Sequence, residues 1–132
     1  MIKKTLFLFC ILFLLITASE CSTEEGWGNP FITIVNKSDK SVEFVMGEQY
    51  PDTVFRFGHS VSVAPNSQRD YTYYLSRTKL FKKYPVMQVF AIPVENTSLP
   101  VDTIRKYYLY ERYKLTKDQL EKDNWILVYP KE

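Results

Sequence analysis

Short segments with a strand-like pattern follow one another from Phe31 to Tyr129, and residues that favour turns separate them. Apolar side chains alternate within several segments, as at Val42, Phe44 and Met46, which places them on one face of a strand. The segments are residues 31–35, 41–46, 60–64, 69–75, 86–92, 109–115 and 125–129. About seven strands at this spacing favour a mainly β fold, an antiparallel β-sandwich.

Three of these segments carry more detailed predictions. Residues 31–35 and 41–46 flank the polar loop 36–40, so we expect them to pair as a hairpin. Residues 69–75 place Tyr71, Tyr73 and Leu75 on one side. Residues 86–92 are apolar at both parities, which predicts a central strand that is covered on both faces.

Two short helices are expected near the C-terminus. The polar Ser98 and the early Pro100 predict the start of the first helix, in which Val101, Ile104 and Tyr108 recur at helical spacing. Neither helix is long enough for the repeated crossovers of a parallel sheet, so both are compatible with the sandwich.

The second helix has the clearer signal. Residues 116–119 read Thr-Lys-Asp-Gln, which is the spacing of a capping box. Leu115 and Leu120 stand where a hydrophobic staple would place them. We expect Tyr113, Leu115, Leu120 and Trp125 to be buried together in one core.

Composition limits the class of protein. The 132 residues are 45% hydrophobic and 24% charged, with 4 Gly and 7 Pro, which is typical of a single globular domain. Two Cys and one His exclude a disulfide-stapled scaffold, a multi-thiolate metal site and a histidine cluster. We therefore expect no metal and no cofactor.

The charge gives no argument for nucleic acid as a partner. The net charge is +2, and without Lys3, Lys4 and Glu20 the chain has 15 basic against 14 acidic residues. This balance is too small for a basic recognition surface, and the sequence has no compact recognition motif. Lys82 and Lys83 are interpreted as solvated charges.

The N-terminal 20 residues have the organisation of a signal peptide. A cationic start at residues 1–4 precedes an apolar run of 14 residues from Thr5 to Ala18. As a helix this run would span about 21 Å, less than the roughly 30 Å hydrocarbon core of a bilayer. It therefore predicts an export signal rather than a transmembrane helix.

Cys21 directly follows this segment and is the expected site of lipid attachment. Bacterial lipoproteins place an acylated cysteine at this position, and the small residues Ala18 and Ser19 suit cleavage next to it. Glu20 departs from the usual Gly, Ala or Ser. The alternative is a plain secretory peptide that is cut after Ser19, which would leave Cys21 as a free thiol on a soluble exported protein.

Residues 21–30 form an acidic stretch that is poor in apolar side chains, and we interpret it as a tether between the lipid and residues 31–132. Its Ser-Thr-Glu-Glu at residues 22–25 resembles the acidic export signal of Bacteroidetes lipoproteins. That resemblance implies the outer face of the outer membrane, exposed at the cell surface.

A resemblance to known sequences lies in residues 101–107, 111–116, 118–120 and 124–130, with weaker pieces at 36–39 and 50–53. With these segments the chain resembles a family of small uncharacterised lipoproteins of Bacteroides-type bacteria. The resemblance implies an exported lipoprotein of unknown function and supplies no catalytic residues.

Tyrosines and two threonines are the candidate binding and modification sites. Ten tyrosines exceed what one small core can bury, so some are expected to be exposed, where they favour recognition. Thr53 and Thr103 each follow an Asp, and both sites resemble the Asp-Thr-apolar acceptors of Bacteroides-type O-glycosylation. In the structural alternative both are turns or caps, with Asp102 at a helix N-terminus.

An enzyme is not expected. His59 is the single histidine, and no spacing pairs it with a nucleophile or an orienting carboxylate. Glu43, Glu48 and Asp52 are carboxylates that nothing in the sequence brings together.

Two classes of function follow. The first is a lipid-anchored envelope protein that binds a glycan or an envelope protein through a tyrosine-rich face. The second is a structural envelope component without a small ligand.

Overall fold

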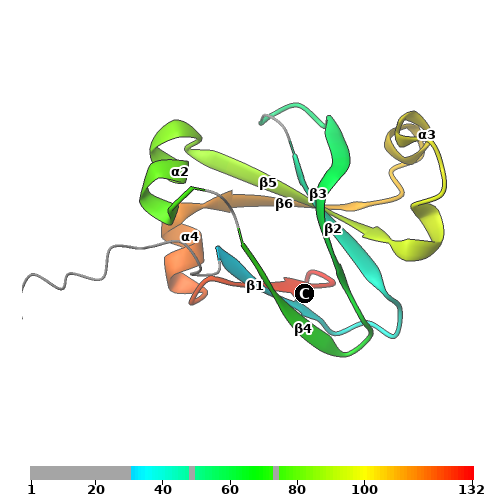
Figure 1. Ribbon diagram of the computed structural model, residues 1–132, viewed down its shortest axis with the longest axis horizontal. Helices are drawn as coiled ribbons and strands as arrows, with labels where there is room; N and C mark the ends of the chain where they lie inside the picture. The colour runs from blue at the N-terminus through cyan, green and yellow to red at the C-terminus, as the bar shows by residue number, and fades with distance from the viewer. Residues whose placement is uncertain (1–30, 48–49, 73–74) are drawn as a thin grey trace, which may run out of the picture.

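The computed structural model describes residues 31–47, 50–72 and 75–132, and they form two packed β-sheets (Figure 1). The three-stranded sheet has the order β4 (Ser67–Tyr71), β1 (Ile32–Asn36), β7 (Ile126–Tyr129). The four-stranded sheet has the order β3 (Phe55–Val63), β2 (Val42–Gly47), β5 (Val86–Pro93), β6 (Glu111–Thr116). The mainly β sandwich expected from the sequence is confirmed.

All neighbouring strands are antiparallel except β1 and β7, which run parallel. The predicted hairpin between residues 31–35 and 41–46 is wrong, because β1 pairs with β4 and β7 whereas β2 pairs with β3 and β5. The polar loop after β1 therefore carries the chain from one sheet to the other.

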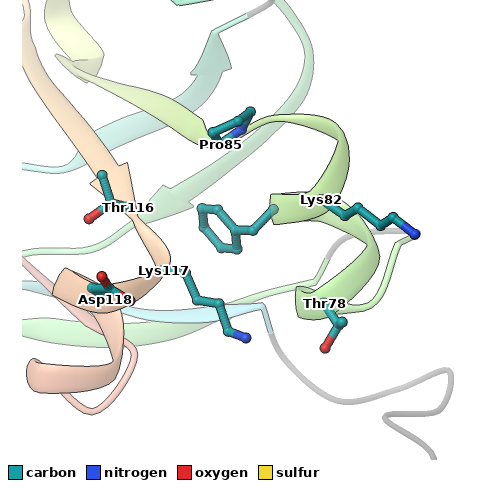
Figure 2. A pocket seen from close by; sticks show the side chains of 7 residues that line it. Thr78, Lys82, Pro85, Thr116, Lys117 and Asp118 are labelled. Carbon is teal, nitrogen blue, oxygen red and sulfur yellow. The ribbon is translucent and has the colours of Figure 1, made fainter.

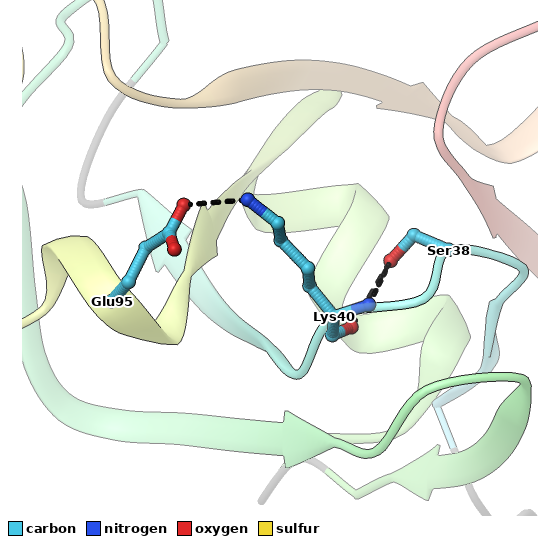
Figure 3. A network of polar contacts seen from close by, with 3 residues as sticks. All are labelled: Ser38, Lys40 and Glu95. Carbon is cyan, nitrogen blue, oxygen red and sulfur yellow. Dashed lines mark hydrogen bonds and ion pairs between the residues drawn. The ribbon is translucent and has the colours of Figure 1, made fainter.

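Asn36 holds this crossing. Its fully buried side chain donates from Nδ2 to the carbonyl oxygens of Lys40 (2.7 Å) and Val63 (3.0 Å), and its Oδ1 accepts from Ser38 N (3.0 Å). The loop is also tied to a 3-10 helix, η1 (Val94–Asn96), by the Lys40–Glu95 ion pair at 3.0 Å (Figure 3). A buried amide is stable only when its donors and acceptors are satisfied, and here they are.

The main core lies between the sheets. Successive residues of a strand point to opposite faces, so Val42 and Phe44 enter this core while Val45 enters a second cluster on the outer face of the four-stranded sheet. Strand β5 contributes to both, as its apolar residues at both parities predicted. The second cluster comprises Val45, Phe55, Phe90, Ile92 and Ile104.

Three short α-helices accompany the sheets: α2 (Arg77–Lys83), α3 (Val101–Lys106) and α4 (Lys117–Lys122). Helices α3 and α4 are the two that the sequence predicts, and α2 was not foreseen. The side chain of Thr116 caps α4 by accepting from Gln119 N, and Leu120 is buried, as expected. None of the described helices combines the length and apolar composition needed to cross a membrane.

Two sequence predictions about where elements begin and end are wrong. Ser98 does not cap α3; the N-cap position is Pro100, which makes no side-chain hydrogen bond. Strand β4 ends at Tyr71, so Leu75 does not extend its face, and Tyr73 lies outside the described residues.

Candidate functional site

The molecule has two distinct ends. Helices α2 and α4 lie at one end of the long axis, and α3 lies at the other, while β5 and β6 run between them (Figure 1). The sequence-predicted features divide between these ends, so each end is described in turn.

Exposed apolar side chains gather at the α3 end. Among the described residues, six large hydrophobic side chains are exposed, and four of them lie on the single connection between β5 and β6. We call these four the α3 surface: Val94, Leu99, Tyr107 and Tyr108. Tyr107 is 61% exposed and Tyr108 is 78% exposed, so this connection contributes the two most accessible of the six.

The end of α3 forces Tyr108 outward. Tyr108 has a φ of 52°, and its N–H reaches Arg105 O (3.3 Å) while Leu109 N reaches Ile104 O (3.0 Å). These two bonds form a Schellman motif, in which the residue in the left-handed region is usually glycine. Tyr108 thus leaves the face that it was expected to share with Val101 and Ile104.

Helix α4 also ends with a residue in the left-handed region, and there it is asparagine. Asn124 has a φ of 54°, and Trp125, with a φ of 60°, donates its N–H to Leu120 O at 2.7 Å. Asparagine tolerates the left-handed region better than tyrosine does. A tyrosine at this position in α3 therefore costs more backbone energy than the asparagine of α4 does.

The α3 surface rests on packed rings. Tyr108 lies 6.3 Å from Tyr110, ring centroid to ring centroid. The ring of Tyr110 contacts Phe90 edge-on at 5.2 Å and Phe55 at 6.3 Å, both within the second cluster. The exposed tyrosine is in this way continuous with the core beneath it.

Both predicted glycosylation sites also lie at the α3 end, and both threonines are half-buried. Thr103 is in the first turn of α3, where Asp102 also lies, and Thr53 Oγ1 accepts from Arg105 Nη2 at 3.3 Å. Arg105 Nη1 lies 3.8 Å from Asp102 Oδ1, and its Nε is buried without a hydrogen-bond partner. Arg105 therefore joins the loop that carries Thr53 to the helix that carries Thr103.

The opposite end holds a shallow depression of about 480 Å³ between α2 and α4 (Figure 2). It is lined by Thr78, Phe81, Lys82, Pro85, Thr116, Lys117 and Asp118. Figure 2 shows Lys82 on α2 pointing away from the depression, whereas Lys117 extends from α4 into the space between the two helices.

The first described residue, Phe31, is fixed at this end. Its ring lies 5.9 Å from that of Phe81 and 6.4 Å from that of Trp125. Arg77 Nε donates to Phe31 O at 3.2 Å, and the Arg77 guanidinium lies 4.0 Å above the Trp125 ring. Cys21, the expected lipid attachment site, lies outside the described residues.

Among the described residues, the candidate catalytic side chains do not come together in one site. The Ser60 hydroxyl donates to the Glu43 carboxylate, and the Asp52 carbonyl accepts from the Gln88 amide. Glu48 and the side chain of His59 lie outside the described part. Within residues 31–47, 50–72 and 75–132, no group of three or more His, Cys, Asp or Glu is placed to hold a metal ion.

The perturbed tyrosines belong to the core rather than to either end. Burial raises the pKa of Tyr71 to about 12. Burial, with the Glu111 carboxylate as a second cause, raises the pKa of Tyr113 above its usual range. Tyr113 Oη donates to Val128 O (3.0 Å) and Glu111 Oε1 (3.2 Å). Both side chains are thus held as neutral phenols at physiological pH.

The sequence predicts the exposure of tyrosines only in part. The number of tyrosines predicted that some would be exposed, and Tyr107 and Tyr108 are. The sequence analysis did not predict the depression between α2 and α4, because it did not predict α2. In comparisons with protein-family models, curated proteins and solved structures, the chain matches none of them.

Proposed function

We propose that this protein is a lipid-anchored envelope protein that binds another envelope protein through the α3 surface. The observation that carries the proposal is the division of the molecule into two ends. The described chain begins at Phe31 beside α2, and the exposed tyrosines lie at the far end.

The length of the tether supports this arrangement. Nine residues, 22–30, separate Cys21 from Phe31, and the ten Cα–Cα steps from Cys21 to Phe31 span at most about 35 Å when fully extended. An acyl chain on Cys21 would keep the α2 end close to the bilayer. The α3 surface would then face away from the membrane, where a partner can reach it.

The chemistry of the α3 surface favours a protein partner. Two exposed tyrosines share the β5–β6 connection with the exposed aliphatic side chains of Leu99 and Val94, and tyrosine is enriched among the residues that dominate protein interfaces. The charges on residues 94–110 are balanced, with Glu95 and Asp102 against Arg105 and Lys106. A neutral, partly aliphatic surface gives no electrostatic reason for an anionic ligand.

Site-specific photocrosslinking tests the proposal. A photoreactive phenylalanine analogue replaces Tyr107 or Tyr108 in cells that export and acylate the protein. Tyr50, another exposed tyrosine on the β2–β3 connection, serves as the matched control position. We expect a discrete protein adduct from positions 107 and 108 and none from position 50.

Other outcomes change the proposal in defined ways. An adduct that carries sugar and no peptide would replace the protein partner with a glycan. Equal adducts from all three positions, or none, would favour a structural envelope component without a specific partner. In our proposal the protein lies on the outer membrane, exposed at the cell surface, and sugars on Thr53 and Thr103 would flank the α3 surface.

A further inference from the structure

Helix α2 carries the densest positive charge of the described chain. Its seven residues include Arg77, Lys79, Lys82 and Lys83 and no acidic residue. Leu80 and Phe81 are buried against the core, whereas the three lysines are exposed. The apolar side chains thus fix the helix and leave Lys79 and Lys82 on its exposed side, whereas Arg77 is half-buried above the Trp125 ring.

The neighbouring helix does not cancel this charge. Helix α4 contributes Lys117 and Lys122, and against them stand Asp118, Glu121 and the C-cap residue Asp123. The two helices together have six basic and three acidic side chains, a surplus of three. The chain as a whole has a surplus of only two, so positive charge is concentrated at the α2 end.

Residues after α2 suit the boundary between lipid headgroups and water. Tyr84 is half-buried with Lys83 Nζ 5.1 Å from its ring centroid, and Pro85 is exposed at the rim of the depression. Aromatic side chains with a polar tip, next to lysines with long apolar stems, are found at this level of a bilayer. Lys82 and Lys117 line the same depression (Figure 2).

We propose that α2 binds the anionic headgroups of the membrane that holds the acylated Cys21, and so orients the domain with the α3 surface outward. The inference rests on the proposed lipid anchor. Phe31 and α2 are in direct contact, because Arg77 Nε donates to Phe31 O. A chain that leaves the domain at this point therefore brings α2, rather than α3, to the bilayer.

Vesicle binding by the mature chain without acylation tests the inference. Residues 21–132 are produced without the signal peptide, so that no acyl chain is attached. The protein is sedimented at low salt with vesicles of phosphatidylcholine alone, or of phosphatidylcholine with about a third phosphatidylglycerol. A lysine near an anionic surface contributes about fivefold in binding, so we expect replacement of Lys79, Lys82 and Lys83 by Gln to weaken binding on the order of 100-fold.

The matched control removes the same charge at other sites. Lys37, Lys40 and Lys106 are exposed and lie outside α2 and α4, and their replacement by Gln leaves binding within a few-fold of the wild type. Binding by the wild type is lost on pure phosphatidylcholine and at high salt. Equal loss in the two triple variants, or no binding to anionic vesicles, would overturn the inference.

This experiment tests headgroup binding by α2 independently of the proposed acylation of Cys21. The vesicles report contact by α2 in a protein that has no lipid. Acylation of Cys21 is read from the mass of the protein made in its host, whatever the vesicles show.

Discussion

Tyr108 occupies a backbone position that glycine or asparagine usually fills. Its φ of 52° follows from the Schellman motif that ends α3, and its side chain is 78% exposed. The left-handed backbone conformation is unfavourable for a tyrosine, and the exposed side chain gains little from burial in return. Trp125 also has a positive φ, of 60°, but packs against the core, so it is the exposure of Tyr108 that favours a role in binding.

We therefore expect Tyr108→Gly to stabilise the fold while it abolishes partner capture. Relief of the left-handed conformation should raise the free energy of unfolding by about 0.5–1 kcal/mol. Asn124→Gly at the end of α4 is the control, and it should change stability by only a few tenths of a kcal/mol in comparison. Urea denaturation measures the free energy of unfolding of both variants. A marked loss of stability in Tyr108→Gly would contradict the interpretation that the backbone of Tyr108 is strained.

Gly47 is required for a different reason, which is space. A Cβ atom at this position would lie 2.5 Å from Gln88 Cγ and 2.7 Å from Phe90 Cε2. Both neighbours are buried in strand β5, so neither can move freely. Gly47→Ala should lower the free energy of unfolding by about 1–3 kcal/mol.

Gly58 provides the matched control for Gly47. A Cβ atom there meets nothing within 4 Å, so Gly58→Ala should leave stability unchanged or slightly higher. Similar destabilisation of the two alanine variants in urea would show that the close approach at Gly47 does not matter.

At the scale of the elements, local patterns predicted most of the strands and helices, whereas they did not predict which strands pair. Each of the seven predicted segments overlaps one strand, and apolar residues at both parities identified β5 as central. The bounds were less accurate, because β3 begins at Phe55 rather than at Ser60, and β4 ends at Tyr71 rather than at Leu75. The wrong hairpin has a physical cause: β1 pairs with β4 and with β7, which are distant in sequence, and no local pattern encodes such pairing. Helix α2 was missed because its signal is short, although Ser76 caps it by accepting from Lys79 N.

The same limit applies to the candidate site. The tyrosines are visible in the sequence, but their exposure depends on where each helix ends. Tyr108 was expected on the helical face of Val101 and Ile104, whereas α3 ends at Lys106. Helix ends are decided by capping geometry, which periodicity alone does not reveal.

The cap of α4 gives a prediction at this scale. Thr116 Oγ1 accepts from Gln119 N, so Thr116→Ala removes the partner of an N–H in the first turn. We expect a loss of about 1 kcal/mol in the free energy of unfolding, with most of it restored in Thr116→Ser. If serine is no better than alanine in urea denaturation, the hydroxyl is not the stabilising group.

At the scale of the whole molecule, the sandwich separates two surfaces of different chemistry. The α2 end has a surplus of three positive charges, whereas the charges on the β5–β6 connection balance. The sheets between them are held by a continuous core that includes the buried Tyr71 and Tyr113. In our proposal, an acyl anchor on Cys21 would present the α2 end to the bilayer and the α3 surface to a partner.

The stability of this core should fall at alkaline pH. Tyr71 has its pKa raised to about 12 in the folded protein, whereas the unfolded value is about 10. Its contribution is therefore fully present below pH 10 and is lost as the pH rises from 10 to 12. Between pH 9 and pH 11 the wild type should lose about 1.4 kcal/mol more than Tyr71→Phe does. Urea denaturation at the two pH values measures this difference. If the wild type and Tyr71→Phe lose the same free energy of unfolding, the pKa of Tyr71 is not raised in the folded protein.

The intact mass of the mature protein from its native host tests the central claim most directly. We predict the mass of residues 21–132 increased by acyl chains on Cys21, with further sugar-sized increments if Thr53 or Thr103 is glycosylated. An unmodified mass, or a chain that begins at Glu20, would contradict the anchor and with it the orientation of the α3 surface away from a membrane.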